Sequence, residues 1–151
     1  ELLHAFKYKG YENLGLHLGR WFGEFMLPEL SKTEIDLIVP VPLHRRKLMK
    51  RGFNQSAIIA AGISELSSLP LDETAVVRVS RNKSQTTKSR FSRIMDVREI
   101  FKVRDSSCIA GKHILLVDDV VTTGSTIASC ATVLLNSGAG KVSIAALAAA
   151  Q

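Results

Sequence analysis

The sequence has little of what marks membrane proteins, disulfide-stapled proteins or metal-binding modules. Its two cysteines, Cys108 and Cys130, are too few for a disulfide framework and stand at no metal-binding spacing. The longest apolar runs fall far short of the ~20 residues that cross a bilayer, and the N-terminus lacks the charged-then-apolar pattern of a signal peptide. These absences predict a cytoplasmic protein that does not insert into a membrane.

Histidine is also scarce and scattered, since His4, His17 and His113 share no spacing that predicts a metal site. The chain of 151 residues is 46% hydrophobic and 23% charged, which is typical of an ordinary globular domain. We predict one domain over residues 1–151, with an N-terminal helical part at 1–34 and a core at 35–151. Because the chain begins at Glu1 rather than Met, we expect it to be a fragment.

Acids are missing where bases gather in this chain of net charge +6. Residues 37–64 contain no aspartate or glutamate, while five bases fall between residues 45 and 51. A second stretch, residues 78–104, carries nine bases against two acids. Such surfaces bind anions, so one interpretation is a site for phosphate, pyrophosphate or nucleic acid. The other interpretation is a solvated face that binds nothing.

Hydrophobic periodicity predicts strands and helices in alternation. An amphipathic helix is expected between Tyr11 and Met26, ended by Pro28, with its apolar stripe at Leu14, Leu18, Trp21, Phe22 and Phe25. A further helix is expected from about Asn54, with Asn54 or Ser56 as its cap. The remaining predictions are strands at 35–41, 75–79, 100–103, 113–118 and 141–148, a polar loop at 83–93 and a helix at 126–135. This alternation predicts an α/β domain with a mostly parallel sheet flanked by helices.

The stretch ILLVDDVVTTGST, residues 114–126, is the most specific motif in the chain. Its aliphatic strand ends in Asp118 and Asp119, and ligands of such sheets bind beyond the carboxyl ends of the strands. The next loop opens a helix whose free amides favour an anion, and Gly124 lets the backbone approach that anion closely. Two carboxylates would repel a phosphate, but they accept hydrogen bonds from a vicinal diol. The stretch therefore predicts a 5-phosphoribosyl site. The alternative interpretation is one Asp as a helix cap and the other in solvent.

The same thirteen residues resemble the diphosphoribosyl-binding motif of the type I phosphoribosyltransferases: hydrophobic residues, two acids and a Thr/Gly loop. Two further stretches, LLHAFKYKG (residues 2–10) and VPVPLHRRKLMKRGFNQS (39–56), resemble the ComF family of competence-associated proteins. SQTTKSRFSRIMDVREIF (84–101) resembles that family more loosely. The resemblance extends over nearly the whole chain. It implies a type I phosphoribosyltransferase (Rossmann-like) fold with a flexible loop over the site.

The resemblance also implies roles for two loops. Asp118 and Asp119 would bind the ribose 2- and 3-hydroxyls. The ribose 5-phosphate would lie against Thr122, Thr123, Gly124, Ser125 and Thr126. The pyrophosphate would lie in the loop after an earlier strand, at Pro42, Leu43, His44, Arg45 and Arg46, where arginines suit a leaving pyrophosphate. Magnesium is the implied cofactor, held mainly by oxygens of the ligand rather than directly by the protein.

The resemblance identifies no single catalytic residue. The loop that would close over the site corresponds to residues 83–93, and its candidate contacts are Lys83, Gln85, Lys88 and Arg90. His44 is a further candidate, as a proton carrier or as a polar loop residue. Around the loop the ComF pattern is closer to Gln-Thr-Gly-Leu, Asn-Val and Gly-Ala-Phe, where this chain has Thr87, Lys88, Asp96, Glu99 and Ile100. ComF relatives also carry a zinc-ribbon-like segment ahead of residues 2–10, and we take it to be absent here.

Two functions follow as hypotheses. The first is an enzyme that binds 5-phosphoribosyl 1-diphosphate, or a related phosphosugar, with Mg²⁺ and transfers the phosphoribosyl group to an acceptor that no residue identifies. The second is a non-catalytic competence protein associated with single-stranded DNA, whose basic stretches would meet DNA or proteins of the competence machinery. Against it, only Phe53, Phe91 and Phe101 lie in or beside those stretches, and single-strand binding normally uses exposed aromatics. A homodimer is a further expectation.

Overall fold

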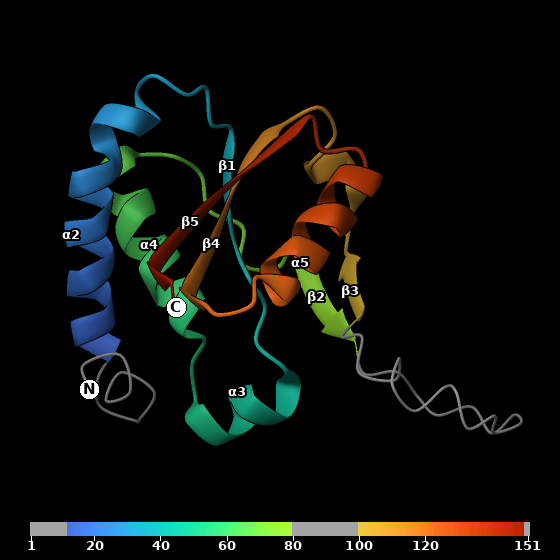
Figure 1. Cartoon of the computed structure of the whole chain (residues 1–151), viewed down its shortest axis with the longest axis horizontal. Helices are drawn as coiled ribbons and strands as arrows, with labels where there is room; N and C mark the ends of the chain where they lie inside the picture. The colour runs from blue at the N-terminus through green and yellow to red at the C-terminus, as the bar shows by residue number, and fades with distance from the viewer. Residues whose placement is uncertain (1–11, 80–99, 150–151) are drawn as a thin grey trace, which may run out of the picture.

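The computed structural model describes residues 12–79 and 100–149, and its elements alternate largely as predicted (Figure 1). The helices are α2 (Glu12–Leu30), α3 (Arg45–Arg51), α4 (Gln55–Ser67) and α5 (Ser125–Asn136), with a 3₁₀ turn, η2, at Ser106–Cys108. The strands are β1 (Leu37–Pro40), β2 (Val76–Val79), β3 (Ile100–Val103), β4 (His113–Val121) and β5 (Lys141–Ala149). The predicted loop at 83–93 and the stretch 2–10 lie outside the described residues.

β1, β4 and β5 form a parallel sheet with β4 in the centre. Val39 of β1 pairs with Leu116 of β4, which pairs with Ile144 of β5. Pro40 is tolerated because β1 lies at the edge of this sheet: two residues earlier, Ile38 donates its N–H to Pro70 and not to β4. The parallel order confirms the predicted α/β class. It also places the carboxyl ends of β1 and β4 side by side.

The parallel sheet separates two layers of packing. Because successive strand residues point to opposite faces, Ile114 and Leu116 pack in the core cluster that contains α5 residues, whereas Leu115 and Val117 pack in the cluster that contains α4 residues. In Figure 1, α2 and α4 lie on one side of the sheet and α5 lies on the other. Burial on both faces accounts for the nearly continuous aliphatic run of β4.

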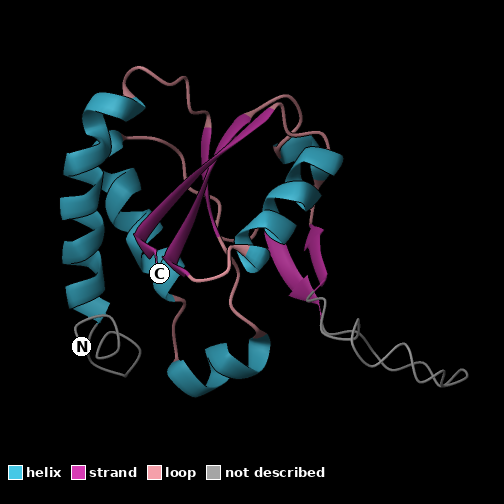
Figure 2. Cartoon of the chain, viewed as in Figure 1, coloured by secondary structure: helices cyan, strands magenta, loops and turns pink. Residues whose placement is uncertain are grey.

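β2 and β3 pair antiparallel in a small separate sheet, which the sequence did not predict. Figure 2 shows it beside α5, apart from the three parallel strands. Val76 and Phe101 bury this pair in the same core cluster as α5. Val79 and Ile100, the residues on either side of 80–99, are partners in the ladder.

α2 and α4 are in backbone contact along a seam of glycines. A Cβ atom on Gly19 would lie 2.6 Å from the carbonyl oxygen of Ile59. A Cβ atom on Gly62 would lie 2.6 Å from the backbone nitrogen of Arg20 and equally close to the carbonyl carbon of Gly19. No side chain fits between these helices at the crossing, so the glycines set how closely α2 approaches α4.

Two details predicted for α2 are wrong. Trp21 and Phe25 do not share the buried face, since 64% and 74% of their surfaces are exposed; the glycine seam takes that face instead. Pro28 does not end the helix, which continues to Leu30. Although Pro28 removes one donor, the last turn is closed by the Ser31 N–H, which donates to the Leu27 carbonyl at 2.9 Å. Neither α2 nor any other described helix has the length and apolarity needed to cross a membrane.

We predict that Gly62→Ala destabilises the fold. In the interior of an ordinary helix, Gly→Ala stabilises the helix by up to about 1 kcal/mol. Here the new methyl group would collide with backbone atoms of α2. Overpacking of this kind costs about 1–3 kcal/mol, measurable as the free energy of unfolding in urea. Ala128→Ser, which adds one heavy atom on the exposed face of α5, is the control and should change that free energy little. A stabilised Gly62→Ala protein would show that the seam is not closely packed.

Candidate functional site

Asp118 and Asp119 lie near the carboxyl end of β4, inside the strand. The strand runs to Val121, three residues beyond its predicted end. Asp118 pairs in register with Ala146 of β5, and beyond Asp119 the pairing resumes at Val120 and Val121. The sheet therefore holds both acids, and only residues 122–124 form the turn into α5.

Asp118 is a buried carboxylate with two donors on one of its oxygens. The Oγ of Ser56, from α4, donates to Oδ1 at 2.9 Å, and the N–H of Asp119 donates to the same atom at 2.9 Å. Burial raises the pKa of Asp118 to about 6; the Ser56 hydrogen bond opposes that rise, and the charge of Asp119 adds to it. Both of these donors bind Oδ1, which fixes the orientation of the carboxylate.

The turn from β4 into α5 has the backbone of an anion site. Gly124 adopts a left-handed conformation (φ 76°) directly before Ser125, the first residue of α5. Gly124 has no side chain with which to cap the helix, and the Ser125 N–H reaches Thr123 Oγ1 only at 3.4 Å. The first-turn amides are therefore largely available to an anion, beside the exposed hydroxyls of Thr122, Thr123 and Ser125.

The predicted pyrophosphate segment is a loop over Pro42–His44, and its last two residues, Arg45 and Arg46, begin a helix. Arg45–Arg51 form α3, and His44 is its N-cap, with Nδ1 accepting from the Arg46 N–H at 3.2 Å. Gly52, in a left-handed conformation, ends α3. This helix could not be predicted from the sequence. None of its seven residues is buried, so the segment has no apolar periodicity.

A cavity of about 270 Å³, here called the β4 cavity, lies between the ends of β1 and β4 and the start of α4. Of the predicted site residues it brings together Pro42, Leu43, Asp118, Asp119 and residues 122–126. His44, Arg45 and Arg46 are not among its lining residues. Residues that the sequence did not assign to a site complete it: Lys47, Arg51, Asn54, Gln55, Ser56 and Arg78. The loop candidates Lys83, Gln85, Lys88 and Arg90 lie outside the described residues.

Asn54 and Ser56, interpreted from sequence as alternative helix caps, connect α4 to the sheet. Asn54 occupies the N-cap position, but its side chain makes no capping bond, and Nδ2 donates to the Val41 carbonyl at 3.0 Å. Ser56 donates to Asp118. The polar run Asn54–Ser56 is the sequence feature that indicates these contacts. A helix needs only one N-cap residue, so the other polar side chains of the run are expected to bind a different partner.

Arg78 brings a cation to the β4 cavity from the antiparallel pair. Its guanidinium carbon lies 5.7 Å from the centroid of the Phe101 ring. Burial lowers the pKa of Arg78, while the charge of Asp118 acts in the opposite direction. Arginine nonetheless stays protonated, so Arg78 is a fixed positive charge near the acids. The single arginine within the strand AVVRV (residues 75–79) was the signal in the sequence.

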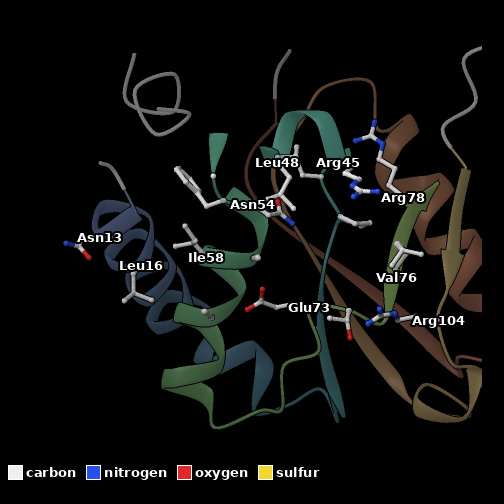
Figure 3. Close-up of a pocket in the computed structure, with 18 residues that line it drawn as sticks. Asn13, Leu16, Arg45, Leu48, Asn54, Ile58, Glu73, Val76, Arg78 and Arg104 are labelled. Carbon is white, nitrogen blue, oxygen red and sulfur yellow. The ribbon is translucent and has the colours of Figure 1, made fainter. Parts of the chain in front are cut away.

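A larger cleft of about 830 Å³ adjoins the β4 cavity, and the two share Pro42, Leu43, Asn54 and Arg78 as walls. Figure 3 shows Arg45 and Arg78 on one side of this cleft and α2, with Asn13 and Leu16, on the opposite side. Apolar side chains form much of its wall, among them Leu48, Ile58 and Val76. The predicted residue Arg45 therefore faces this cleft and not the cavity with the acids.

The carboxylates of the β4 cavity suit a magnesium ion that arrives with a phosphorylated ligand. Across residues 12–79 and 100–149, no three His, Cys, Asp or Glu side chains gather as a ready-made metal site. The cavity does hold two hard oxygen donors, Asp118 and Asp119. Mg²⁺ commonly binds through one or two carboxylates together with substrate phosphates and waters, and this donor set fits that pattern.

Comparison with known proteins finds a family model and curated relatives. Residues 48–151 match the family model described as phosphoribosyl transferase domain. The DNA utilization protein YhgH of Escherichia coli (strain K12) is 33% identical over 95% of this chain and 63% of its own length. Competence protein ComFC of Bacillus subtilis (strain 168) is 33% identical over 91% of this chain and 54% of its own length. The chain thus spans somewhat more than half of these relatives.

Solved structures agree on the fold. A purine phosphoribosyltransferase from Pyrococcus horikoshii superposes with a TM-score of 0.57 at 18% identity, covering 87% of this chain and 72% of its own. The glutamine phosphoribosylpyrophosphate amidotransferase from B. subtilis gives 0.56 at 24% identity, covering 86% of this chain and 26% of its own. At these identities the likeness carries the fold alone, and it confirms the predicted type I phosphoribosyltransferase fold.

We predict that Asp118→Asn stabilises the free protein at high pH only. The folded pKa of about 6 lies above the ordinary 3.8, so this carboxyl's contribution to stability is complete below about pH 4 and is lost as the pH rises through 6. Asparagine keeps the acceptor for Ser56 and does not ionise. The free energy of unfolding of the variant should therefore exceed that of wild type by up to about 3 kcal/mol at pH 8. At pH 4 the two values should be close. Urea unfolding measures both. A difference independent of pH would contradict this account.

Proposed function

The chain is a ComF-type member of the phosphoribosyl transferase domain family, and from that membership we propose that the β4 cavity binds 5-phosphoribosyl 1-diphosphate. The observation that carries the proposal is the buried 2.9 Å hydrogen bond from Ser56 to Asp118. This bond fixes a carboxylate in a cavity that also contains the N-terminus of α5. A diol acceptor beside an anion site suits a sugar phosphate better than either feature alone.

The proposal divides the ligand among three groups of residues. The 5-phosphate accepts from the first-turn amides of α5 and from the hydroxyls of residues 122–126. The ribose 2- and 3-hydroxyls donate to Asp118 and Asp119. The diphosphate lies toward the cations of the cavity, which are Lys47, Arg51 and Arg78. Each part of the ligand thereby meets groups of opposite charge or complementary hydrogen-bonding character.

Magnesium enters the proposal with the ligand. Asp118 and Asp119 would hold it, and when bound it would offset part of the diphosphate charge. The residues of the chain then have two tasks. They orient the sugar, and through Arg51, Lys47 and Arg78 they stabilise the negative charge that builds on the departing pyrophosphate.

We further propose that the protein transfers the phosphoribosyl group. A nucleophile would form a bond to ribose C1 while the bond from C1 to the diphosphate oxygen breaks, its electron pair leaves with pyrophosphate, and the nucleophile gives up its proton. The larger cleft supports this step because it shares Pro42, Leu43, Asn54 and Arg78 with the β4 cavity. An acceptor in that cleft would lie beside the ribose.

A second candidate function is association with single-stranded DNA, favoured by the surface of α3. None of its residues is buried, and Arg46 and Lys50 are exposed cations that line neither the β4 cavity nor the larger cleft. Cations without a role in a small-molecule site suit a polyanion. The names of two relatives, a DNA utilization protein and a competence protein, agree with this candidate.

We also place the protein in the cytoplasm. Cys108 and Cys130 are both free thiols, and burial raises the pKa of the Cys130 thiol to about 12. Unpaired cysteines are usual in a reducing compartment. A cytoplasmic location would also give access to phosphorylated sugars.

We predict that Asp119→Asn weakens binding of 5-phosphoribosyl 1-diphosphate with Mg²⁺ at least tenfold in calorimetry. Hydrogen bonds to charged groups are worth about 1.5–3 kcal/mol, or about 10–150-fold in affinity. Glu24→Gln, which removes an exposed carboxylate that lines neither the cavity nor the cleft, is the matched control and should bind like wild type. Wild-type protein that binds no ligand would refute the proposal.

Turnover is tested separately, by measuring pyrophosphate release in the presence of each of a panel of bases and amines. No release with any compound would favour the non-catalytic candidate.

We predict that Arg46→Ala combined with Lys50→Ala weakens single-stranded DNA binding and leaves 5-phosphoribosyl 1-diphosphate binding unchanged. Each phosphate neutralised on a single strand contributes about −0.7 to the log–log salt slope. The double variant should therefore flatten that slope by about 1.4, measured by fluorescence anisotropy across a salt series. If the wild-type protein shows no salt-dependent affinity, the DNA candidate is wrong.

A further inference from the structure

Gln55, the first residue of α4, is a buried amide in the wall of the β4 cavity. Only 2% of its surface is exposed. Its Oε1 accepts from the Nη1 of Arg51 at 3.1 Å. A guanidinium has donors and no acceptor, so the oxygen of the amide must face Arg51. The orientation of the side chain is thereby fixed, and its NH₂ group faces away from Arg51.

That NH₂ group is a donor with nothing to donate to. Nε2 of Gln55 is buried and has no hydrogen-bond partner among the residues that the structure describes. Buried polar groups in folded proteins are nearly always paired, because an unpaired donor loses its hydration without compensation. A fixed, unpaired donor in the wall of a cavity is therefore positioned to donate a hydrogen bond to an acceptor atom of a ligand.

The residues around Gln55 indicate which kind of ligand group would be that acceptor. The neighbouring Ser56 is already engaged by Asp118, and the first-turn amides of α5 come from a different segment of the chain. On the α3–α4 segment the lining consists of the neutral residues Asn54, Gln55 and Ser56 and two cations, Lys47 and Arg51. A neutral donor among cations suits an oxygen-rich anion and not a sugar hydroxyl, for which the two carboxylates are available.

We propose that Gln55 donates a hydrogen bond to the diphosphate of the bound ligand and thereby selects diphosphorylated sugars over ribose 5-phosphate. The inference rests on the proposed function. It names Gln55 as the specificity residue and Arg51 as the residue that positions it, through the hydrogen bond to Oε1. It also moves the diphosphate contact from the predicted Arg45–Arg46 segment to the turn between α3 and α4.

The test is Gln55→Glu, measured by calorimetry with Mg²⁺ and three probes: 5-phosphoribosyl 1-diphosphate, inorganic pyrophosphate and ribose 5-phosphate. Glutamate keeps the shape of the side chain and an acceptor for Arg51, but it replaces the donor by a negative charge. We expect at least tenfold weaker binding of the two diphosphates and less than twofold change for ribose 5-phosphate. Asn136→Asp, the same amide-to-acid change at an exposed position at the end of α5, should alter none of the three.

Gln55→Met removes the donor without adding charge, so it serves if glutamate disturbs folding, and thermal melts of both variants report that disturbance. It should show the same selective loss for the two diphosphates. Equal weakening for all three probes would mean that Gln55 only supports the cavity, and no weakening would mean that a buried water satisfies the amide; either result overturns the inference. These failures are distinct from failure of the proposed function, in which the wild-type protein itself binds no 5-phosphoribosyl 1-diphosphate.

Discussion

The hydrogen bond from Ser56 to Asp118 is the constraint on which the site depends. It joins the first turn of α4 to the end of β4 across 62 residues of sequence. It can form only if α4 lies close against the sheet. Ile59 and Ile63 of α4 pack in one cluster with residues of β4, and the bond from Asn54 to Val41 adds to this contact. The cost is a desolvated carboxyl whose pKa is raised to about 6. Carboxyl groups with a strongly raised pKa in the wall of a cavity are typical of binding sites.

The β4 cavity accounts for two acids in a basic chain. Asp118 and Asp119 lie within one cavity wall, with Lys47, Arg51 and Arg78 elsewhere in the lining. Acids alone would repel a phosphate, and bases alone would offer nothing to a diol. The combination matches a ligand that carries both groups, and the uncapped start of α5 adds a second anion site. The helix-cap interpretation of the two acids does not explain this gathering of opposite charges.

Parts of the fold that are set by local pattern were predictable, and parts set by contacts between distant segments were not. β4 and α5 were visible because burial imposes an aliphatic run on one and a helical period on the other. α3 was hidden because it buries nothing. Gln55, Ser56 and Arg78 have only weak local signals, a short polar run and a lone arginine in a strand, and each reaches the β4 cavity through the packing of α4 and β2. The glycines of α2 give no apolar signal, whereas the aromatic residues at helical spacing indicate a different buried face.

The most direct test of the central claim is a crystal structure of the protein soaked with 5-phosphoribosyl 1-diphosphate and Mg²⁺. The account predicts ribose hydroxyls on Asp118 and Asp119, the 5-phosphate at the N-terminus of α5, and the diphosphate against the α3–α4 turn. A ligand bound with its phosphate away from residues 122–126, or well-soaked crystals with an empty β4 cavity, would contradict it.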